Sequence, residues 1–233
     1  MQHACYLASL RRTLYFHITI HQRVNSQTIE IRMEKITIIF ATNNQHKTDE
    51  IKAVTGNQFN IITLKEAGID IDIPEPHDTL KANASEKSRT IHEITRQNCF
   101  SEDTGLEVFA LNGEPGVKSA RYAGDEKNFQ ANIDKLLLKL KYIPDRSARF
   151  RTVISLIWDN KEYFFEGTCE GHIIAEQKGN SGFGYDPVFI PDGSEKTFAE
   201  MSLEEKNLFS HRRKATDLLI SFLNNPSSWK ELK

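Results

Sequence analysis

The sequence has little cysteine and no long apolar segment. Its three cysteines, Cys5, Cys99 and Cys169, are far apart in 233 residues and form no CxxC or Cys/His metal spacing. This pattern is typical of free thiols in a reducing compartment, so we expect a cytoplasmic protein. No apolar run approaches the roughly 20 residues that a membrane-spanning helix needs, and we expect no membrane partner.

The sequence also lacks a basic excess. It has 30 Lys and Arg residues against 32 Asp and Glu residues, which gives a formal net charge of -2. Proteins that coat nucleic acid usually carry a basic surplus, so this balance argues against a nucleic-acid partner. A local cationic pocket for a small anion remains compatible with it.

The first 32 residues differ from the rest of the chain. They lack the apolar core and the small-residue cleavage site of a signal peptide. Met33 stands directly before the strongly strand-like run Ile36–Phe40. We interpret residues 1–32 as an upstream extension, either disordered or preceding the native start, and a short targeting or interaction arm is the alternative. The domain is then expected at 33–228.

Strand-like and helix-like segments alternate from residue 35 onward. Strands are predicted at 36–40, at 59–64, at 150–158 and 161–174 as a hairpin, and at 188–190; helices are predicted after the turn at 41–44, after a cap at 78 or 79, and at 129–140. Residues 99–111 are interpreted as strand, loop and strand, with the loop at 103–105. A capping box at Ser202 predicts a helix that continues through Phe222. The sequence therefore predicts one α/β domain with a mixed sheet.

A polar turn, Thr42-Asn43-Asn44-Gln45-His46-Lys47, follows the first predicted strand. The N–H groups and the positive dipole at a helix N-terminus favour an anion, and Lys47 adds a full charge. The turn lacks the glycines of a Walker A loop. A capped helix with a solvated lysine is the alternative interpretation.

Two adjacent acids, Glu102 and Asp103, come before Thr104 and Gly105. Neighbouring side chains on a strand point to opposite faces, but a turn would bring both acids toward one cation. Mg²⁺ prefers a few carboxylates together with substrate phosphates. The pair is therefore a candidate metal site, and an acidic turn without a ligand is the alternative.

A glycine-rich loop, Ser181–Pro187, carries an aromatic and an acid. Phe183, next to Gly184, is suited to stack on a base, and Asp186 is suited to accept a hydrogen bond from a ring N–H. A core aromatic in a hairpin loop would give the same pattern.

Basic residues gather near the C-terminus. Lys206 and Ser210 are four positions apart and share a face if one helix contains both. Lys206 is then a candidate phosphate ligand, while His211 and Arg212 are candidates for contact with a base edge. A basic helix face in water is the alternative.

Taken together and in order, these motifs resemble the inosine triphosphate pyrophosphatase family, also called non-canonical purine NTP pyrophosphatases. The matching pieces are TNNQHK, EPHDTLKANASEK, SEDTGL, GEPGVKSARYAG, SGFGYDPVF and MSLEEKNLFSHR. The resemblance implies an elongated mixed β-sheet flanked by helices, with two lobes around a central nucleotide cleft. It also implies a Mg²⁺ cofactor, a homodimer, and hydrolysis of ITP, dITP and XTP to the monophosphate and pyrophosphate.

The resemblance carries residue roles with it. Asp103 takes the catalytic base and metal roles, and Glu75 matches a second metal-ligand position. The residues expected to bind substrate are Thr42, Asn43, Asn44, Gln45, His46, Lys47, Thr104, Phe183, Gly184, Tyr185, Asp186, Lys206, His211 and Arg212, and Lys87 is a possible phosphate contact.

This sequence departs from the family pattern at three positions. Asn43 replaces a usual glycine, and asparagine is a tolerated substitute if that position needs a positive φ. Glu102 replaces an aspartate with a longer acid, and Ala82 replaces a glutamate, which leaves position 82 without an acidic role. A pyrophosphatase for other nucleotides, a non-catalytic nucleotide-binding protein and a nucleic-acid-binding module are the rival functions.

Overall fold

The computed structural model of the chain describes residues 35–226, so the predicted extension at 1–32 lies outside the described residues. Within this range, seven strands form one mixed sheet in the order β2-β1-β3-β5-β6-β7, with β4 paired to β3. The strands are β1 (Thr37–Phe40), β2 (Asn60–Thr63), β3 (Cys99–Val108), β4 (Pro115–Gly116), β5 (Ser147–Trp158), β6 (Lys161–Ile173) and β7 (Phe189–Pro191). β1 runs parallel to β2 and β3, and the remaining pairs are antiparallel.

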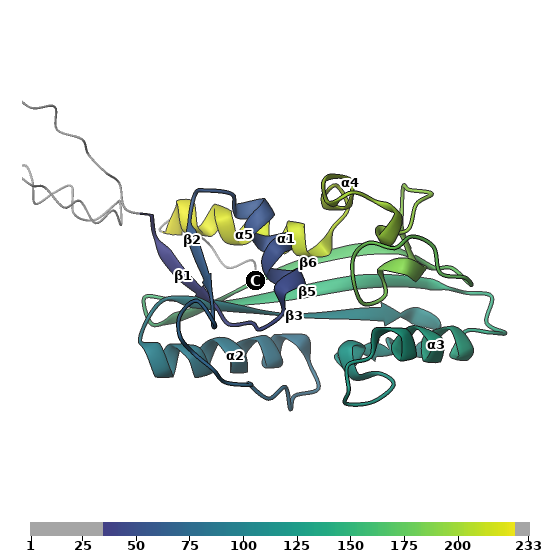
Figure 1. The fold of residues 1–233 in the computed structure, drawn as a ribbon, viewed down its shortest axis with the longest axis horizontal. Helices are drawn as coiled ribbons and strands as arrows, with labels where there is room; N and C mark the ends of the chain where they lie inside the picture. Colours follow the sequence, from purple (N-terminus) through teal and green to yellow (C-terminus); the bar gives the residue numbers. More distant parts are fainter. Residues whose placement is uncertain (1–34, 227–233) are drawn as a thin grey trace, which may run out of the picture.

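Helices cover both faces of this sheet, as Figure 1 shows. α1 (Gln45–Thr55), α4 (Leu203–Asn207) and α5 (His211–Asn224) lie on one side, and α2 (Leu80–Thr95) and α3 (Phe129–Lys139) lie on the other. The long strands β3, β5 and β6 run the length of the molecule and connect its two ends. The predicted α/β fold with an elongated mixed sheet is confirmed.

Apolar side chains are concentrated at the two ends of the long strands. At one end, Phe100, Leu156 and Phe165 pack against α1 and α5. At the other end, Leu106 and Phe150 pack against α3 and β7. The middle of β3, from Ser101 to Thr104, is polar and buried or half-buried. Charged side chains can be held in this middle section only where partners satisfy them.

Two sequence predictions about secondary structure are wrong. The loop predicted at 103–105 is absent, because β3 continues through it and pairs with β5 along its whole length, with Asp103 opposite Val153. The C-terminal helix is interrupted: α4 ends at Asn207, and Ser210 caps a separate α5 by accepting from the N–H of Arg213. Lys206 and Ser210 therefore share no helix face. Cross-strand pairing overrides the local signal in β3, and a second cap overrides it between α4 and α5.

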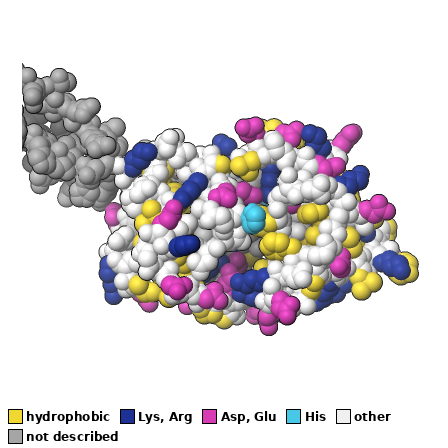
Figure 2. Space-filling model, in the orientation of Figure 1, with side chains coloured by type: hydrophobic (Ala, Val, Ile, Leu, Met, Phe, Trp, Pro, Cys, Tyr) yellow, Lys and Arg dark blue, Asp and Glu magenta, His cyan; other side chains and the backbone are white. Residues whose placement is uncertain are grey.

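The described part of the chain has no helix long and apolar enough to cross a membrane. On the face shown in Figure 2, positive and negative side chains are interspersed, and apolar side chains are more frequent toward the end that carries α3. The exposed large apolar side chains of the described residues include Phe109, Phe129, Leu138 and Tyr142.

Candidate active site

The candidate site is a cavity of about 370 Å³ beside the polar middle of β3. Its wall includes Thr42, Lys47, Glu75, Asp103, Phe183 and Arg212, which come from widely separated parts of the sequence. Thr104, Gly184, Tyr185, Asp186, Lys206 and His211 also line it. The sequence motifs thus meet around one space that is large enough for a small organic ligand.

The polar turn between β1 and α1 forms one side of this cavity. Asn44 caps α1 by accepting from the N–H of Lys47, and Thr42 Oγ1 accepts from the N–H of Asn44. The backbone of Asn43 does not have a positive φ. Its side-chain amide donates to the carbonyl of Ile71. Asparagine therefore needs no left-handed backbone here.

Two members of that turn do not line the cavity. Gln45 donates to Asp49 on the exposed face of α1. His46 stacks on Phe183, with 5.1 Å between the ring centroids and 12° between the ring planes. His46 therefore packs against a residue of the cavity wall without lining the cavity itself.

The two adjacent acids of β3 point to opposite sides of the sheet. Glu102 lies toward α1 and α5, where it pairs with Lys47 at 3.0 Å and accepts from Arg212 Nε at 2.8 Å. Asp103 lies toward α2, where Lys87 is 3.3 Å away. The expectation that a turn brings both acids toward one cation is wrong, because the strand continues and its side chains alternate.

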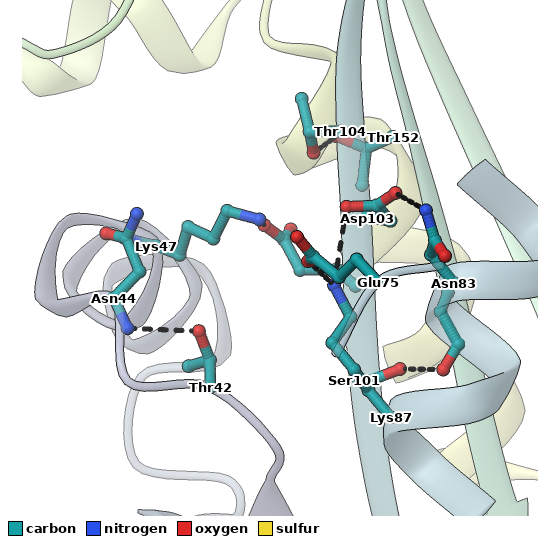
Figure 3. A network of polar contacts seen from close by, with 12 residues as sticks. Thr42, Asn44, Lys47, Glu75, Asn83, Lys87, Ser101, Asp103, Thr104 and Thr152 are labelled. Carbon is teal, nitrogen blue, oxygen red and sulfur yellow. Dashed lines mark hydrogen bonds and ion pairs between the residues drawn. The ribbon is translucent and has the colours of Figure 1, made fainter. Parts of the chain in front are cut away.

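Asp103 shares its lysine with Glu75. Lys87 Nζ is 2.6 Å from Glu75 Oε1 and 3.3 Å from Asp103 Oδ1, so one ammonium group bridges both carboxylates. Figure 3 shows Lys87 reaching this pair from α2 while Lys47 approaches from α1. The second oxygen of Asp103 lies 3.5 Å from Asn83 Nδ2, and that of Glu75 lies 2.8 Å from Arg121. The two carboxylates that the family pattern associates with metal therefore already surround a single positive charge.

The two carboxylates have different acidities. Burial would raise the pKa of Glu75, but Lys87 and Arg121 outweigh it and lower the pKa to about 2. Burial also raises the pKa of Asp103, and there Lys87 and Lys47 only partly oppose the shift. A raised pKa in a cavity is typical of a proton acceptor in a catalytic site.

A buried ionic network holds Lys206 and Arg212. Lys206 Nζ contacts Glu50 at 2.8 Å and Asp186 at 2.7 Å. The guanidinium of Arg212 bridges Glu50 and Glu102 through Nη1 and Nε, and its Nη2 donates to Thr104 Oγ1 at 3.3 Å. Burial favours the uncharged arginine, but the two carboxylates raise the pKa of Arg212 further above its ordinary value.

Gly167 on β6 allows the start of α5 to approach the sheet. A Cβ atom there would lie 2.2 Å from the carbonyl oxygen of His211. The glycine therefore places His211 and Arg212 directly over the polar middle of the sheet.

The loop at 181–187 folds around Asp186. Asp186 Oδ2 accepts from the N–H of Phe183 at 2.9 Å, and Gly182 leaves room for this carboxylate, because a Cβ there would lie 2.2 Å from the same oxygen. Tyr185 is buried and donates to the carbonyl of Ser119. Phe183 is held as an aromatic wall, with Lys206 Nζ at 5.4 Å from its ring centroid.

His211 is buried and packs against Phe150, with 4.7 Å between the ring centroids. Its Nδ1 atom has no hydrogen-bond partner. Burial and the nearby Arg212 and Lys206 keep the pKa of His211 well below its ordinary value. His211 is therefore a neutral imidazole in the cavity wall.

The sequence did not single out several polar residues of the site, among them Glu50, Asn83 and Arg121. Glu50 anchors both Lys206 and Arg212, Asn83 contacts Asp103, and Arg121 contacts Glu75. Glu50 follows Lys47 by three positions on α1, so its place on the same helix face was available as a signal. Asn83 is likewise four positions before Lys87 on α2. Arg121 ends a 3-10 helix of only three residues, Ser119–Arg121, which is too short for a periodic pattern to mark it.

Among residues 35–226, no group of three or more His, Cys, Asp and Glu side chains is arranged to hold a metal ion. Two carboxylates, Glu75 and Asp103, converge on Lys87 Nζ. A metal at this pair would need further ligands from substrate or water, as Mg²⁺ usually has.

This mixed α/β fold, with charged groups converging at the middle of its sheet, defines a small-molecule-binding cleft of the kind that enzymes use. The model of the Ham1 family matches residues 38–222. The chain belongs to the Ham1 family.

Curated relatives and solved structures agree with this assignment. The chain is 52% identical over 192 residues to a dITP/XTP pyrophosphatase from Porphyromonas gingivalis, covering 82% of this chain and 98% of the relative. It is 46% identical to a dITP/XTP pyrophosphatase from Flavobacterium psychrophilum, covering 81% of this chain and 99% of the relative. The Ham1 protein of Staphylococcus aureus superposes with a TM-score of 0.73 at 43% identity, covering 80% of this chain and 97% of that structure. The HAM1 protein of Coxiella burnetii has a TM-score of 0.74 at 34% identity, covering 81% of this chain and 98% of that structure.

Proposed function

We propose that the protein hydrolyses non-canonical purine nucleoside triphosphates, namely ITP, dITP and XTP, to the monophosphate and pyrophosphate. One observation carries the proposal: a single cavity holds a carboxylate pair at Glu75 and Asp103 and an aromatic wall beside a fixed guanidinium at Phe183 and Arg212. Through a bound Mg²⁺ ion, the carboxylate pair would hold the polyphosphate end of a nucleotide. The aromatic ring and the guanidinium suit its base. The relatives from Porphyromonas gingivalis and Flavobacterium psychrophilum, both named dITP/XTP pyrophosphatases, support the same activity.

We propose Mg²⁺ as the cofactor and Glu75 and Asp103 as its protein ligands. Both carboxylates already contact one cationic atom, Lys87 Nζ, so their oxygens converge on a common point. Hard oxygen donors of this kind are the ligands that Mg²⁺ prefers. When bound, the ion would neutralise charge on the triphosphate and polarise the phosphorus under attack.

Asp103 is the proposed base. Its carboxylate is nearly buried, and its raised pKa makes it a better proton acceptor than an ordinary aspartate. In this role Asp103 orients a water molecule in line with the pyrophosphate leaving group and accepts its proton. Catalysis of this type depends mainly on positioning and on charge neutralisation.

The phosphate chain is assigned to Lys47, Lys87 and the N-terminus of α1. Thr42 and Asn44 hold that N-terminus in shape, and Lys47 extends from its first turn toward β3. The helix dipole adds a favourable field for an anion. Lys206, which sequence reasoning assigned to phosphate, packs against Phe183 and Asp186, and this position favours a role at the base.

The base is assigned to the pocket formed by Phe183, Asp186 and Arg212. Arg212 uses three of its five donors on Glu50, Glu102 and Thr104, so donors remain for a ligand in the cavity. A guanidinium cannot accept from the 6-amino group of adenine, whereas it can donate to a 6-oxo group. The pocket therefore favours 6-oxo purines over ATP by leaving a charged donor unpaired with adenine.

A substrate panel tests this function. ITP, dITP, XTP, GTP, ATP and dUTP are each incubated with the protein and Mg²⁺, and pyrophosphate and orthophosphate are measured separately. We expect pyrophosphate from the first three substrates and much slower release from the others. Orthophosphate as the first product would overturn the cleavage position, and a preference for dUTP or ATP would favour the rival that acts on other nucleotides.

We also propose a single bilobal domain at 33–228, a homodimer and a cytoplasmic location. The exposed Phe109, Phe129, Leu138 and Tyr142 supply apolar surface for a second copy. The two cysteines of the described range, Cys99 and Cys169, are free thiols, as is usual in a reducing compartment. Light scattering on the purified chain tests the dimer, and cell fractionation tests the location.

A further inference from the structure

The charges around the cavity are balanced before any ligand binds. Its wall and the layer directly behind it hold six cationic side chains, Lys47, Lys87, Arg121, Lys127, Lys206 and Arg212, and six carboxylates, Glu50, Asp72, Glu75, Glu102, Asp103 and Asp186. A nucleoside triphosphate carries several negative charges, and the site offers no surplus positive charge to match them. A divalent cation that arrives with the nucleotide would supply the missing positive charge.

All four oxygens of the Glu75–Asp103 pair already have protein partners. Lys87 takes one oxygen of each, at 2.6 and 3.3 Å, Arg121 takes the second oxygen of Glu75 at 2.8 Å, and Asn83 lies 3.5 Å from the second oxygen of Asp103. A divalent cation entering here would need the same oxygens. It would also be repelled by the ammonium group between them.

Lys87 is the partner that blocks this position most directly. Its side chain is only 9% exposed, so water does little to stabilise the ammonium group away from the two acids. It extends from α2, whose Asn83 one turn earlier contacts the same Asp103. Lys87 also lines the cavity, where the polyphosphate of a bound nucleotide would offer its ammonium group another anionic partner.

We propose that Lys87 is an internal counter-ion that closes the Glu75–Asp103 pair to free divalent cations and opens it when a bound polyphosphate gives the ammonium group a new partner. This inference rests on the proposed function. It assigns Lys87 a positioning role in addition to a phosphate contact. The nucleotide-free protein then binds the metal weakly, and nucleotide and metal increase each other's affinity, as linkage requires.

The test measures metal binding in the absence of nucleotide. Mn²⁺ serves as the probe, and its free concentration is followed by electron paramagnetic resonance during titration of the full chain. The variant Lys87→Met removes the blocking charge, Lys87→Arg keeps it, and Lys52→Met removes a charge of the same kind from an exposed pair with Glu66. We expect Lys87→Met to bind Mn²⁺ at least about tenfold more tightly than the wild type, because one charge-assisted competitor is gone. The other two variants should match the wild type.

The site of the gain is tested by a second substitution. Adding Glu75→Gln to Lys87→Met should abolish the increased Mn²⁺ affinity, while circular dichroism reports whether each variant is folded. If Lys87→Met fails to fold, Lys87→Gln, which keeps a donor to one carboxylate, takes its place with the same expected direction. Equal Mn²⁺ affinity in the wild type and the folded neutral variant overturns the inference. Failure to hydrolyse ITP, with the expected Mn²⁺ pattern intact, counts against the proposed function alone.

Discussion

Lys206 on α4 and Glu50 on α1 form a buried ion pair, with 2.8 Å between Nζ and Oε1. The second oxygen of Glu50 binds Arg212 on α5, so one carboxylate joins three helices behind the cavity. Lys206 also contacts Asp186, and Arg212 also contacts Glu102. The network therefore fixes the two cationic groups of the base pocket before a ligand arrives.

Glu50→Gln should destabilise the protein markedly. The substitution leaves Lys206 and Arg212 with one buried carboxylate each, and breaking a buried ion pair costs on the order of 3 kcal/mol. Urea unfolding at pH 7 measures the free energy. Glu66→Gln, at an exposed pair with Lys52, is the matched control and should change stability by less than about 1 kcal/mol. Equal losses in both variants would show that Glu50 holds no network together.

Acid should weaken the same network. Burial would raise the pKa of Glu50 and of Glu102, but nearby cations outweigh it and lower both from 4.5 to about 2. Arg212 acts on both acids, Lys206 acts on Glu50, and Lys47 acts on Glu102. A lowered folded-state pKa stabilises the fold fully above about 4.5, and this contribution is lost as the pH falls toward about 2. The urea concentration at the unfolding midpoint should therefore decrease as the pH is lowered from about 4.5 to 3. The decline should be shallower in Glu50→Gln, whose side chain does not titrate, and an unchanged slope would contradict the assignment.

The local part of this fold follows from the sequence. The apolar run at 36–40, the capping box at Ser202 and the turn between β5 and β6 each lie where the pattern predicts an element. That turn contains Asp159 and Asn160, both with positive φ, as a tight hairpin requires. These signals depend on neighbours within a few positions and need no tertiary contact.

The remaining features depend on contacts between distant residues. Gly105 suggested a turn, yet it lies inside β3, where a Cβ atom would be 2.5 Å from the carbonyl oxygen of Gly116 on β4. The glycine therefore serves a close approach between strands. The partnership of Glu50 with Arg212 spans 162 positions, and no pattern within α1 specifies it. The sequence identifies the groups of the site, while the tertiary fold determines which acid neutralises which cation.

Asp103→Asn should abolish turnover and leave the fold intact. The amide keeps the shape of the side chain but loses the charge and the proton-accepting ability that the mechanism needs. Asp134→Asn, on the exposed face of α3, is the control for the same chemical change. Retention of more than about a tenth of the wild-type kcat, a barrier change below about 1.4 kcal/mol, would remove Asp103 from the central role.

Deletion of residues 1–32 should leave activity and Tm nearly unchanged. The family match begins at residue 38, and the sequence of residues 1–32 shows no strong helical or strand periodicity. Both quantities are measured on the full and shortened chains under the same conditions. A Tm decrease of more than about 5 °C, which corresponds to roughly 1–2 kcal/mol, would show that the extension stabilises the domain.

Arg212 should govern the choice of base more than the rate of hydrolysis. Alanine is a poor test, because removal of this buried guanidinium would leave Glu50 and Glu102 facing each other without their shared cation. Arg212→Lys retains the charge and loses the planar set of donors that bridges the two acids and faces the cavity. Thermal melting shows whether the variant is folded.

The measurement is kcat/KM for ITP and ATP on the wild type and on Arg212→Lys. If a guanidinium donor contacts the 6-oxo group, only ITP loses an interaction, worth roughly 1.5–3 kcal/mol for a charged hydrogen bond. The preference for ITP over ATP should then fall about tenfold to a hundredfold. Lys47→Met, at the polyphosphate end, should instead lower kcat/KM for both nucleotides by similar factors. Equal proportional losses in Arg212→Lys would move Arg212 to the polyphosphate, and His211, Asp186 and Phe183 would then be left to select the base.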